Sequence, residues 1–158
     1  MGPFMNTRGE SFTLEGVFVD MEAFVAADLE REYALIIGTD SQHHHDHTVF
    51  VTAIIIHRVG QSARFYYTRR VTHDNLDLTT RILTETSDSV LLVQQLEKSG
   101  VYQYLGREAV EVHIDAGTRG KSQKVLEACI NFVKGMGYQY KVKPDSFGAT
   151  HVADRYTK

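Results

Sequence analysis

Apolar residues recur at helical spacing after Thr13, and this pattern predicts the first helix. The positions that repeat three or four residues apart are Leu14, Val17, Phe18, Met21, Phe24 and Val25. Thr13 can cap this helix, because a threonine hydroxyl accepts a hydrogen bond from the amides of a first turn. The helix is expected to end near Tyr33, and residues 1–12, which carry no pattern, are expected to be loose.

Three segments with the character of strands follow, joined by short connections. Residues 33–40, YALIIGTD, are apolar at successive positions, as expected for a strand covered on both faces. Residues 48–60, TVFVTAIIIHRVG, and residues 62–72, SARFYYTRRVT, predict two further strands. Short links between three strands favour an antiparallel meander.

Helices and strands alternate in the second half of the chain. The predicted elements are a helix at 74–100, a strand at 109–117, a helix at 121–137, a strand at 138–144 and a short helix within 145–158. Asp74 or Asn75 is expected to cap the first of these helices, and Gly100 to end it.

This order of elements predicts an α/β fold with one mixed sheet. The sheet is expected to have five strands in the order 3-2-1-4-5, with the second strand antiparallel to the first. Helices are expected on both faces, with one extra helix at the N-terminus. A single domain over residues 13–158 accounts for the whole pattern, since no linker divides it.

Composition narrows the classes of function. The net charge of -3 argues against a protein that coats nucleic acid by bulk charge, although it allows an enzyme with a local basic groove. The single cysteine, Cys129, excludes an intrachain disulfide and fits a reducing compartment. No apolar run approaches the length of a membrane span, so we expect a cytoplasmic protein without a membrane partner.

Two aspartates each close an apolar strand. Asp40 ends the first predicted strand and Asp115 the fourth. If these strands lie parallel and adjacent, both side chains meet at the carboxyl edge of the sheet, where sites form in α/β proteins. The alternative is that each aspartate merely begins a turn.

A glutamate interrupts the apolar stripe of the helix at 74–100. The stripe is formed by Leu78, Ile82, Glu85, Ser89, Leu92 and Leu96. A buried glutamate is costly unless it is paired or coordinates a metal ion, so Glu85 is a candidate ligand. The alternative is that Glu85 lies at the margin of the stripe and reaches water.

The C-terminal segment offers a fourth acid. Asp154 shares a helical face with His151, three residues earlier, and Asp145 competes with it for the role. Asp154 could equally be solvated, and Asp145 could simply cap the last helix. Clustered carboxylates suit Mg²⁺ or Mn²⁺, and two such ions can hold both the attacking water and the leaving oxygen of a phosphodiester.

The histidine-rich stretch HHHDH, residues 43–47, falls between the first two strands. We expect it to form a solvated hairpin, with no native role in metal binding for His43, His44 and His45. His113 differs, because it precedes Asp115 by two residues and points to the same face. It either lines the site or packs beside it, and packing is favoured.

The stretch DAGTRGKS, residues 115–122, is close to a phosphate-binding P-loop. The motif requires glycine at its first position, where this chain has Asp115, so a Walker-type NTPase is rejected. Arg119, Lys121 and Lys124 are nevertheless candidates to guide a phosphate backbone toward Asp115. The alternative is an ordinary turn between a strand and a helix, with solvated charges.

The motifs IIGTDSQ, TETS, HIDAG, KPDSFGA and ADRYTK resemble those of the YkuK family of bacterial proteins, within the ribonuclease H-like superfamily. The resemblance runs from about residue 10 to the C-terminus. It implies a ribonuclease H-like fold and metal chemistry. Asp40, Glu85 and Asp115 match the family's acids at their positions, and Asp154 matches the acid of the final helix. The extra N-terminal helix and the lack of a clear basic handle depart from typical ribonuclease H.

These observations predict a nuclease that hydrolyses phosphodiester bonds in DNA or RNA with two ions of Mg²⁺ or Mn²⁺. Its metal ligands and catalytic residues are expected to be Asp40, Glu85, Asp115 and Asp154. The alternative is a module that keeps the fold and binds nucleic acid or a protein without cutting. The sequence leaves open the type of nucleic acid, the cleavage polarity and the oligomeric state.

Overall fold

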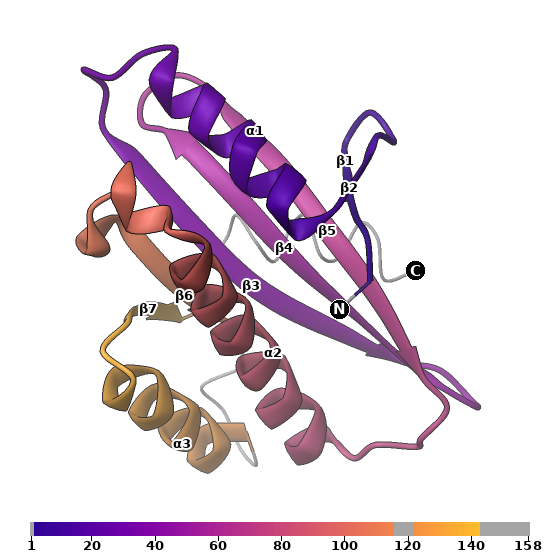
Figure 1. Ribbon diagram of the computed structural model, residues 1–158. Coiled ribbons are helices and arrows are strands. Elements are labelled where there is room, and N and C mark those ends of the chain that lie inside the picture. The colour runs from indigo at the N-terminus through magenta and orange to yellow at the C-terminus, as the bar shows by residue number, and fades with distance from the viewer. Residues whose placement is uncertain (1, 116–121, 143–158) are drawn as a thin grey trace.

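A seven-stranded mixed sheet carries three helices on one of its faces (Figure 1). The computed structural model describes residues 2–115 and 122–142. In chain order the elements are β1 Phe4–Asn6, β2 Ser11–Phe12, α1 Leu14–Ala26, β3 Tyr33–His43, β4 Thr48–Arg58, β5 Ala63–Thr72, α2 Leu78–Ser99, the short 3₁₀ helices η1 Val101–Gln103 and η2 Arg107–Ala109, β6 Val110–Ile114, α3 Ser122–Gly135 and β7 Gln139–Val142. No helix among these residues is both long and apolar enough to cross a membrane.

The expected number of strands was wrong, because the N-terminus forms a hairpin that extends the sheet. β1 pairs with β5, and β2 pairs with β1. Phe4 is buried and Phe12 packs edge-on against the ring of Tyr66, with ring centroids 5.6 Å apart. Residues 1–12 were expected to be loose, since a hairpin of such short strands has no detectable periodicity.

The five strands that the sequence did predict lie consecutively within the sheet. The complete order is β2-β1-β5-β4-β3-β6-β7, which differs from the five-stranded prediction by the added hairpin. β3 pairs antiparallel with β4 and parallel with β6, and β7 continues the parallel part. β3 is therefore the central strand at which antiparallel and parallel pairing meet.

Side-chain caps fix the beginnings of the first two helices. The hydroxyl of Thr13 accepts from the amide of Gly16, which confirms the predicted cap, although α1 ends at Ala26 rather than near Tyr33. The cap of α2 is Asp77, which accepts from the Thr80 amide at 2.8 Å, so the expectation of Asp74 or Asn75 was wrong. Gly100 ends α2 as predicted, with a left-handed φ of 98° that suits glycine.

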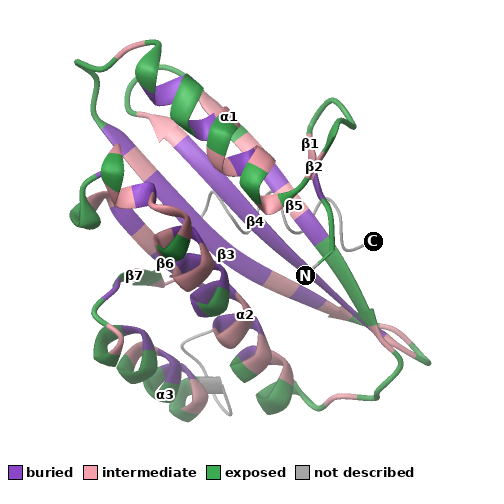
Figure 2. Ribbon diagram, in the orientation of Figure 1, coloured by how far each residue is buried: buried purple, intermediate pink, exposed green. Residues whose placement is uncertain are grey.

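The core lies between the sheet and the helices. Leu35 and Ile37 of β3 point into this core, while Ile36 belongs to a separate apolar cluster on the other face, as strand alternation requires. Figure 2 shows the buried residues of α1, α2 and α3 on the sides that meet the sheet. All three described helices pack on one face, where helices on both faces were expected. The predicted last helix, within 145–158, lies outside the described residues.

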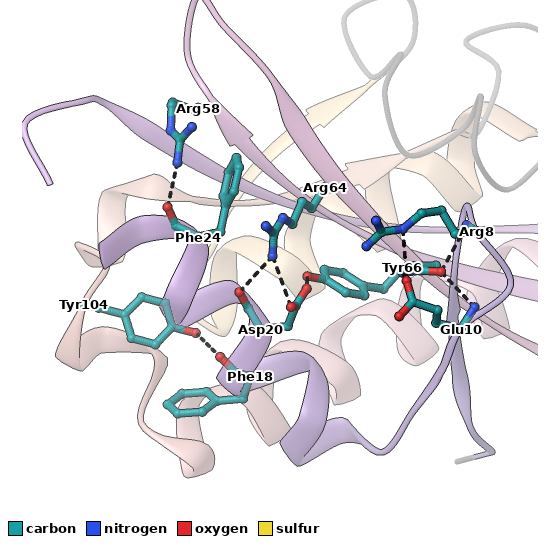
Figure 3. Close-up of polar contacts among 10 residues, drawn as sticks. Arg8, Glu10, Phe18, Asp20, Phe24, Arg58, Arg64, Tyr66 and Tyr104 are labelled. Atoms are coloured by element: carbon teal, nitrogen blue, oxygen red, sulfur yellow. Dashed lines mark hydrogen bonds and ion pairs between the residues drawn. The ribbon is translucent and has the colours of Figure 1, made fainter. Parts of the chain in front are cut away.

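A polar clamp holds α1 to the outer part of the sheet (Figure 3). Asp20 of α1 receives the guanidinium of Arg64 at 3.1 Å and a hydrogen bond from the Tyr66 hydroxyl, both from β5. Burial, followed by the neighbouring Asp20 carboxylate, raises the pKa of Tyr66 above its ordinary value. The phenol therefore keeps its proton and remains the donor in its hydrogen bond to Asp20.

Candidate functional site

The parallel ladder between β3 and β6 aligns the two predicted aspartates. Its last registered pair is Gly38 with His113. Asp40 and Asp115 each follow two residues later, so they lie at the same level at the carboxyl edge of these strands. The predicted parallel neighbourhood of the two strands is confirmed.

Asp40 occupies a different position along its strand from the one expected. β3 continues to His43, and Asp40 is paired with Val51 of β4 inside the antiparallel ladder. Asp115 directly follows the last residue of β6, as predicted. Both aspartates are half-buried, so they border solvent at this edge of the sheet.

Glu85 lies in the middle of α2 and is buried, with 7% of its surface exposed. The alternative that it reaches water was therefore wrong. Its Oε2 accepts a hydrogen bond from the hydroxyl of Ser41, on β3. Arg81, one turn earlier in α2, donates from Nε to that same hydroxyl at 3.1 Å and from Nη2 to the Ser41 carbonyl at 3.4 Å.

The electrostatic surroundings of Glu85 favour its neutral form. Burial is the largest cause, and it raises the pKa of Glu85 from 4.5 to about 8. The hydrogen bond from Ser41 and the charge of Arg81 lower this pKa, and the charge of Asp115 raises it. Asp115 is thus close enough for its charge to act on Glu85.

Strand alternation separates Asp40 from Glu85. Ser41 faces α2 and Glu85, so its neighbour Asp40 lies on the opposite face of β3. Asp115 follows the end of its strand and is related to both acids, by register to Asp40 and by charge to Glu85. Asp115 is therefore the one of the three acids that is related to both of the others.

The described residues do not complete a metal site by themselves. Within 2–115 and 122–142, no group of three or more histidine, cysteine, aspartate or glutamate side chains could hold a metal ion. The candidates that lie outside the described residues are Asp154, Asp145, His151, Arg119 and Lys121. Lys124 is exposed in the first turn of α3.

A row of buried hydroxyls continues the polar surroundings of Glu85 along the interface between α2 and the sheet. The hydroxyl of Thr39 is 2.9 Å from that of Thr52 on β4 and 2.8 Å from that of Ser89 on α2. All three side chains are buried. The interface between α2 and β3 therefore changes from apolar side chains to hydroxyl groups at the residues of β3 on either side of Asp40.

His44 and His113 lie in two different places, the connection from β3 to β4 and the buried part of β6. Residues 44–47 connect β3 to β4, and the amide of His44 donates to the carbonyl of His47 at 2.8 Å, which confirms the hairpin. His113 is buried, and its Nε2 lies 3.2 Å from a carboxylate oxygen of Glu111. Burial lowers the pKa of His113, which favours the neutral imidazole.

Sequence reasoning missed Ser41 and Arg81. Parity along β3 could have indicated Ser41, because it shares a face with the apolar residues Leu35 and Ile37. Arg81 precedes Glu85 by four residues, the spacing at which helical side chains meet, and it lies outside the apolar stripe. An arginine at the edge of a stripe cannot be distinguished from a surface arginine without knowing which strand lies beneath it.

Comparison with known proteins agrees with this architecture. The family model described as "Ribonuclease H-like" matches residues 16–158. The chain belongs to the ribonuclease H-like family. It is also similar to a protein of Bacillus subtilis strain 168 named "Uncharacterized protein YkuK", with 31% identity over 166 residues that cover 98% of this chain and 96% of the relative. No solved structure matches the chain. The N-terminal hairpin precedes the region matched by the family model.

Proposed function

We propose that this ribonuclease H-like domain hydrolyses phosphodiester bonds in DNA or RNA with the help of two divalent cations, Mg²⁺ or Mn²⁺. One observation carries the proposal: the parallel register of β3 and β6 brings Asp40 and Asp115 to the same edge of the sheet, and the buried carboxyl group of Glu85 lies against Ser41, the residue next to Asp40. Carboxylates brought together at the carboxyl end of parallel strands are expected to mark a site.

The chemistry of these residues fits a hard cation. Carboxylate oxygens are the ligands that Mg²⁺ and Mn²⁺ prefer. Burial raises the pKa of Glu85 to about 8, and the nearby charge of Arg81 does not offset this rise, so the carboxyl group keeps its proton at neutral pH. A divalent cation would supply additional positive charge, and Glu85 would then bind as a carboxylate.

In this proposal each acid has a distinct place. Asp40 and Asp115 would share the ions from adjacent strands, and Glu85, on the other face of β3 from Asp40, would hold one ion from α2 beside Asp115. Asp154 would complete the set, with Asp145 as the alternative fourth acid. Bound cations would stabilise the charge that develops on the phosphate and its leaving oxygen. Arg119, Lys121 and Lys124 would bind the phosphate backbone of the substrate.

A second candidate is a module that binds nucleic acid or a protein partner without cutting. It is favoured by one observation, that the described acids do not form a group of three ligands. The two candidates make different predictions about turnover and similar predictions about the fold.

A cleavage assay with matched variants tests the proposal. Labelled single-stranded and double-stranded DNA, RNA, a hybrid and a junction would be incubated with the purified chain in Mg²⁺, Mn²⁺ or EDTA. Asp40→Asn and Glu85→Gln are expected to abolish cleavage, while Glu127→Gln, at an exposed site on α3, should keep it. Binding without metal-dependent cleavage by the unmodified chain would favour the second candidate.

A further inference from the structure

Ser41 and Arg81 form a fixed arrangement behind the Glu85 carboxyl group. The Ser41 hydroxyl lies between Glu85 Oε2 and Arg81 Nε. Arginine can only donate, so the serine oxygen accepts from Arg81 and its single proton is left for Glu85. The second bond, from Arg81 Nη2 to the Ser41 carbonyl, holds the guanidinium against β3.

This arrangement restricts the side chain of Glu85 from two elements. Ser41 is anchored in the central strand of the sheet, and Arg81 is anchored on α2, one turn before Glu85. With Oε2 held by the serine hydroxyl, the carboxyl group has one preferred orientation. Ser41 is buried and Arg81 is half-buried, so water competes little for the shared hydroxyl.

We propose that Ser41 and Arg81 are positioning residues for the cation site, holding the Glu85 carboxylate in the orientation in which it binds the ion. The inference rests on the proposed function, since it assigns a role within that site. A group that orients a ligand from behind commonly changes metal affinity or activity by about 10- to 100-fold when it is removed. Ser41 and Arg81 themselves do not touch the reacting atoms in this assignment.

The chain offers a matched control at the same interface. Ser89 of α2 is also buried, and its hydroxyl bonds to Thr39 of β3, two residues before Ser41. Ser89→Ala removes one hydroxyl contact between α2 and β3, where Ser41→Ala removes the contacts with Glu85 and Arg81, and it leaves Glu85 with its partners. If the role of Ser41 is only structural, both variants lower stability and neither changes Mn²⁺ binding by more than the other.

The test measures Mn²⁺ binding to the full chain by electron paramagnetic resonance or calorimetry, without substrate. Ser41→Ala and Arg81→Gln are expected to weaken Mn²⁺ binding about 10- to 100-fold, whereas Ser89→Ala should bind like the unmodified chain. Ser41→Thr, which keeps the hydroxyl, should restore most of the affinity. Arg81→Lys should restore less, because an ammonium lacks the planar fork that spans the hydroxyl and the carbonyl.

Each outcome decides between the two levels of the proposal. If the unmodified chain binds no Mn²⁺, the cation site fails and the positioning role fails with it. If it binds Mn²⁺ and Ser41→Ala binds equally well, or if Ser89→Ala is weakened to the same degree, the positioning role is overturned and the cation site stands. Should Ser41→Ala unfold, Arg81→Gln compared with Arg81→Lys decides the question in the same way.

Discussion

Gly38 of β3 and His113 of β6 are the last registered pair of a parallel ladder, and each is followed two residues later by an aspartate. This register places Asp40 and Asp115 at the same level of adjacent strands. The pairing of β3 with β6 is enough to bring the two aspartates to the same level, and no particular loop conformation is required. The placement of the two acids therefore depends on the pairing of strands within the sheet.

The first prediction concerns metal binding and stability. Because like charges held close disfavour joint ionisation, Mg²⁺ or Mn²⁺ should bind the folded chain and raise its melting temperature. At one hundred times the dissociation constant the expected stabilisation is about 2.7 kcal/mol. For a chain of this size, each kcal/mol corresponds to a shift of about 2–4 °C. Thermal denaturation across a metal titration measures the shift.

Two variants make this measurement specific. Asp115→Asn should reduce the shift, because Asp115 is the acid related to both Asp40 and Glu85. Glu127→Gln removes an exposed carboxylate from α3 and should leave the shift unchanged. A melting curve that does not respond to either metal would count against a carboxylate site.

The second prediction concerns the pH dependence of stability. The pKa of Glu85 is about 8 in the folded chain, against an ordinary value of 4.5. Between these values the folded chain keeps a proton that the unfolded chain has lost, so the free energy of unfolding falls as pH rises. The slope attributable to Glu85 is at most about 1.4 kcal/mol per pH unit. Urea denaturation in EDTA at several pH values measures it.

Glu85→Gln is the control, because it keeps the shape of the side chain and removes the titration. His113 acts in the opposite direction below its ordinary pKa of 6.5, since burial lowers its pKa and stability rises with pH there. The difference between the unmodified chain and Glu85→Gln isolates the contribution of Glu85. Parallel pH profiles for the two proteins would show that Glu85 titrates normally.

The periodic parts of the fold could be predicted from the sequence, and the short or nonperiodic parts could not. The strands β3, β4 and β5 are long and flanked by turns, and Gly100 is a strong stop for α2. The N-terminal hairpin was missed because β1 and β2 are too short to show alternation. Its register depends on contacts such as that of Phe12 with Tyr66, which are distant in sequence.

The cap of α2 shows a similar limit at the scale of one residue. Asp74, Asn75 and Asp77 are all suitable cap residues within four positions. The structure selects Asp77, and Asp74 instead accepts from the hydroxyl of Thr72 at the end of β5. Which of these residues caps α2 depends on the path of the chain after β5, and the helix propensities of the individual residues do not predict that path.

The candidate site was predicted from residue types, but its inner contacts required the structure. The burial of Glu85 followed from its place in an apolar stripe. The contact with Ser41 depends on how α2 lies over β3, which periodicity alone does not give. Asp40 and Glu85 lie on opposite faces of β3, because Ser41 faces α2 and side chains alternate along a strand.

The third prediction concerns the histidine hairpin. Replacing His43, His44 and His45 with serine should leave any nuclease activity nearly intact, because these residues lie at and beyond the end of β3, in the turn to β4. Asp40→Asn in the same assay is the inactive comparison. Loss of most activity in a triple variant that still melts cooperatively would place the hairpin in the site.

The last prediction tests whether the N-terminal hairpin is a stable part of the sheet. Phe4 is 1% exposed and packs in the main core, so Phe4→Ala should lower the free energy of unfolding by about 3–5 kcal/mol. Leu29→Ala is the control, since Leu29 is 74% exposed and its loss should change stability little. Urea denaturation of both variants makes the comparison. If both variants lost equally little stability, the first residues would be a loose segment after all, and the sheet would end at β5.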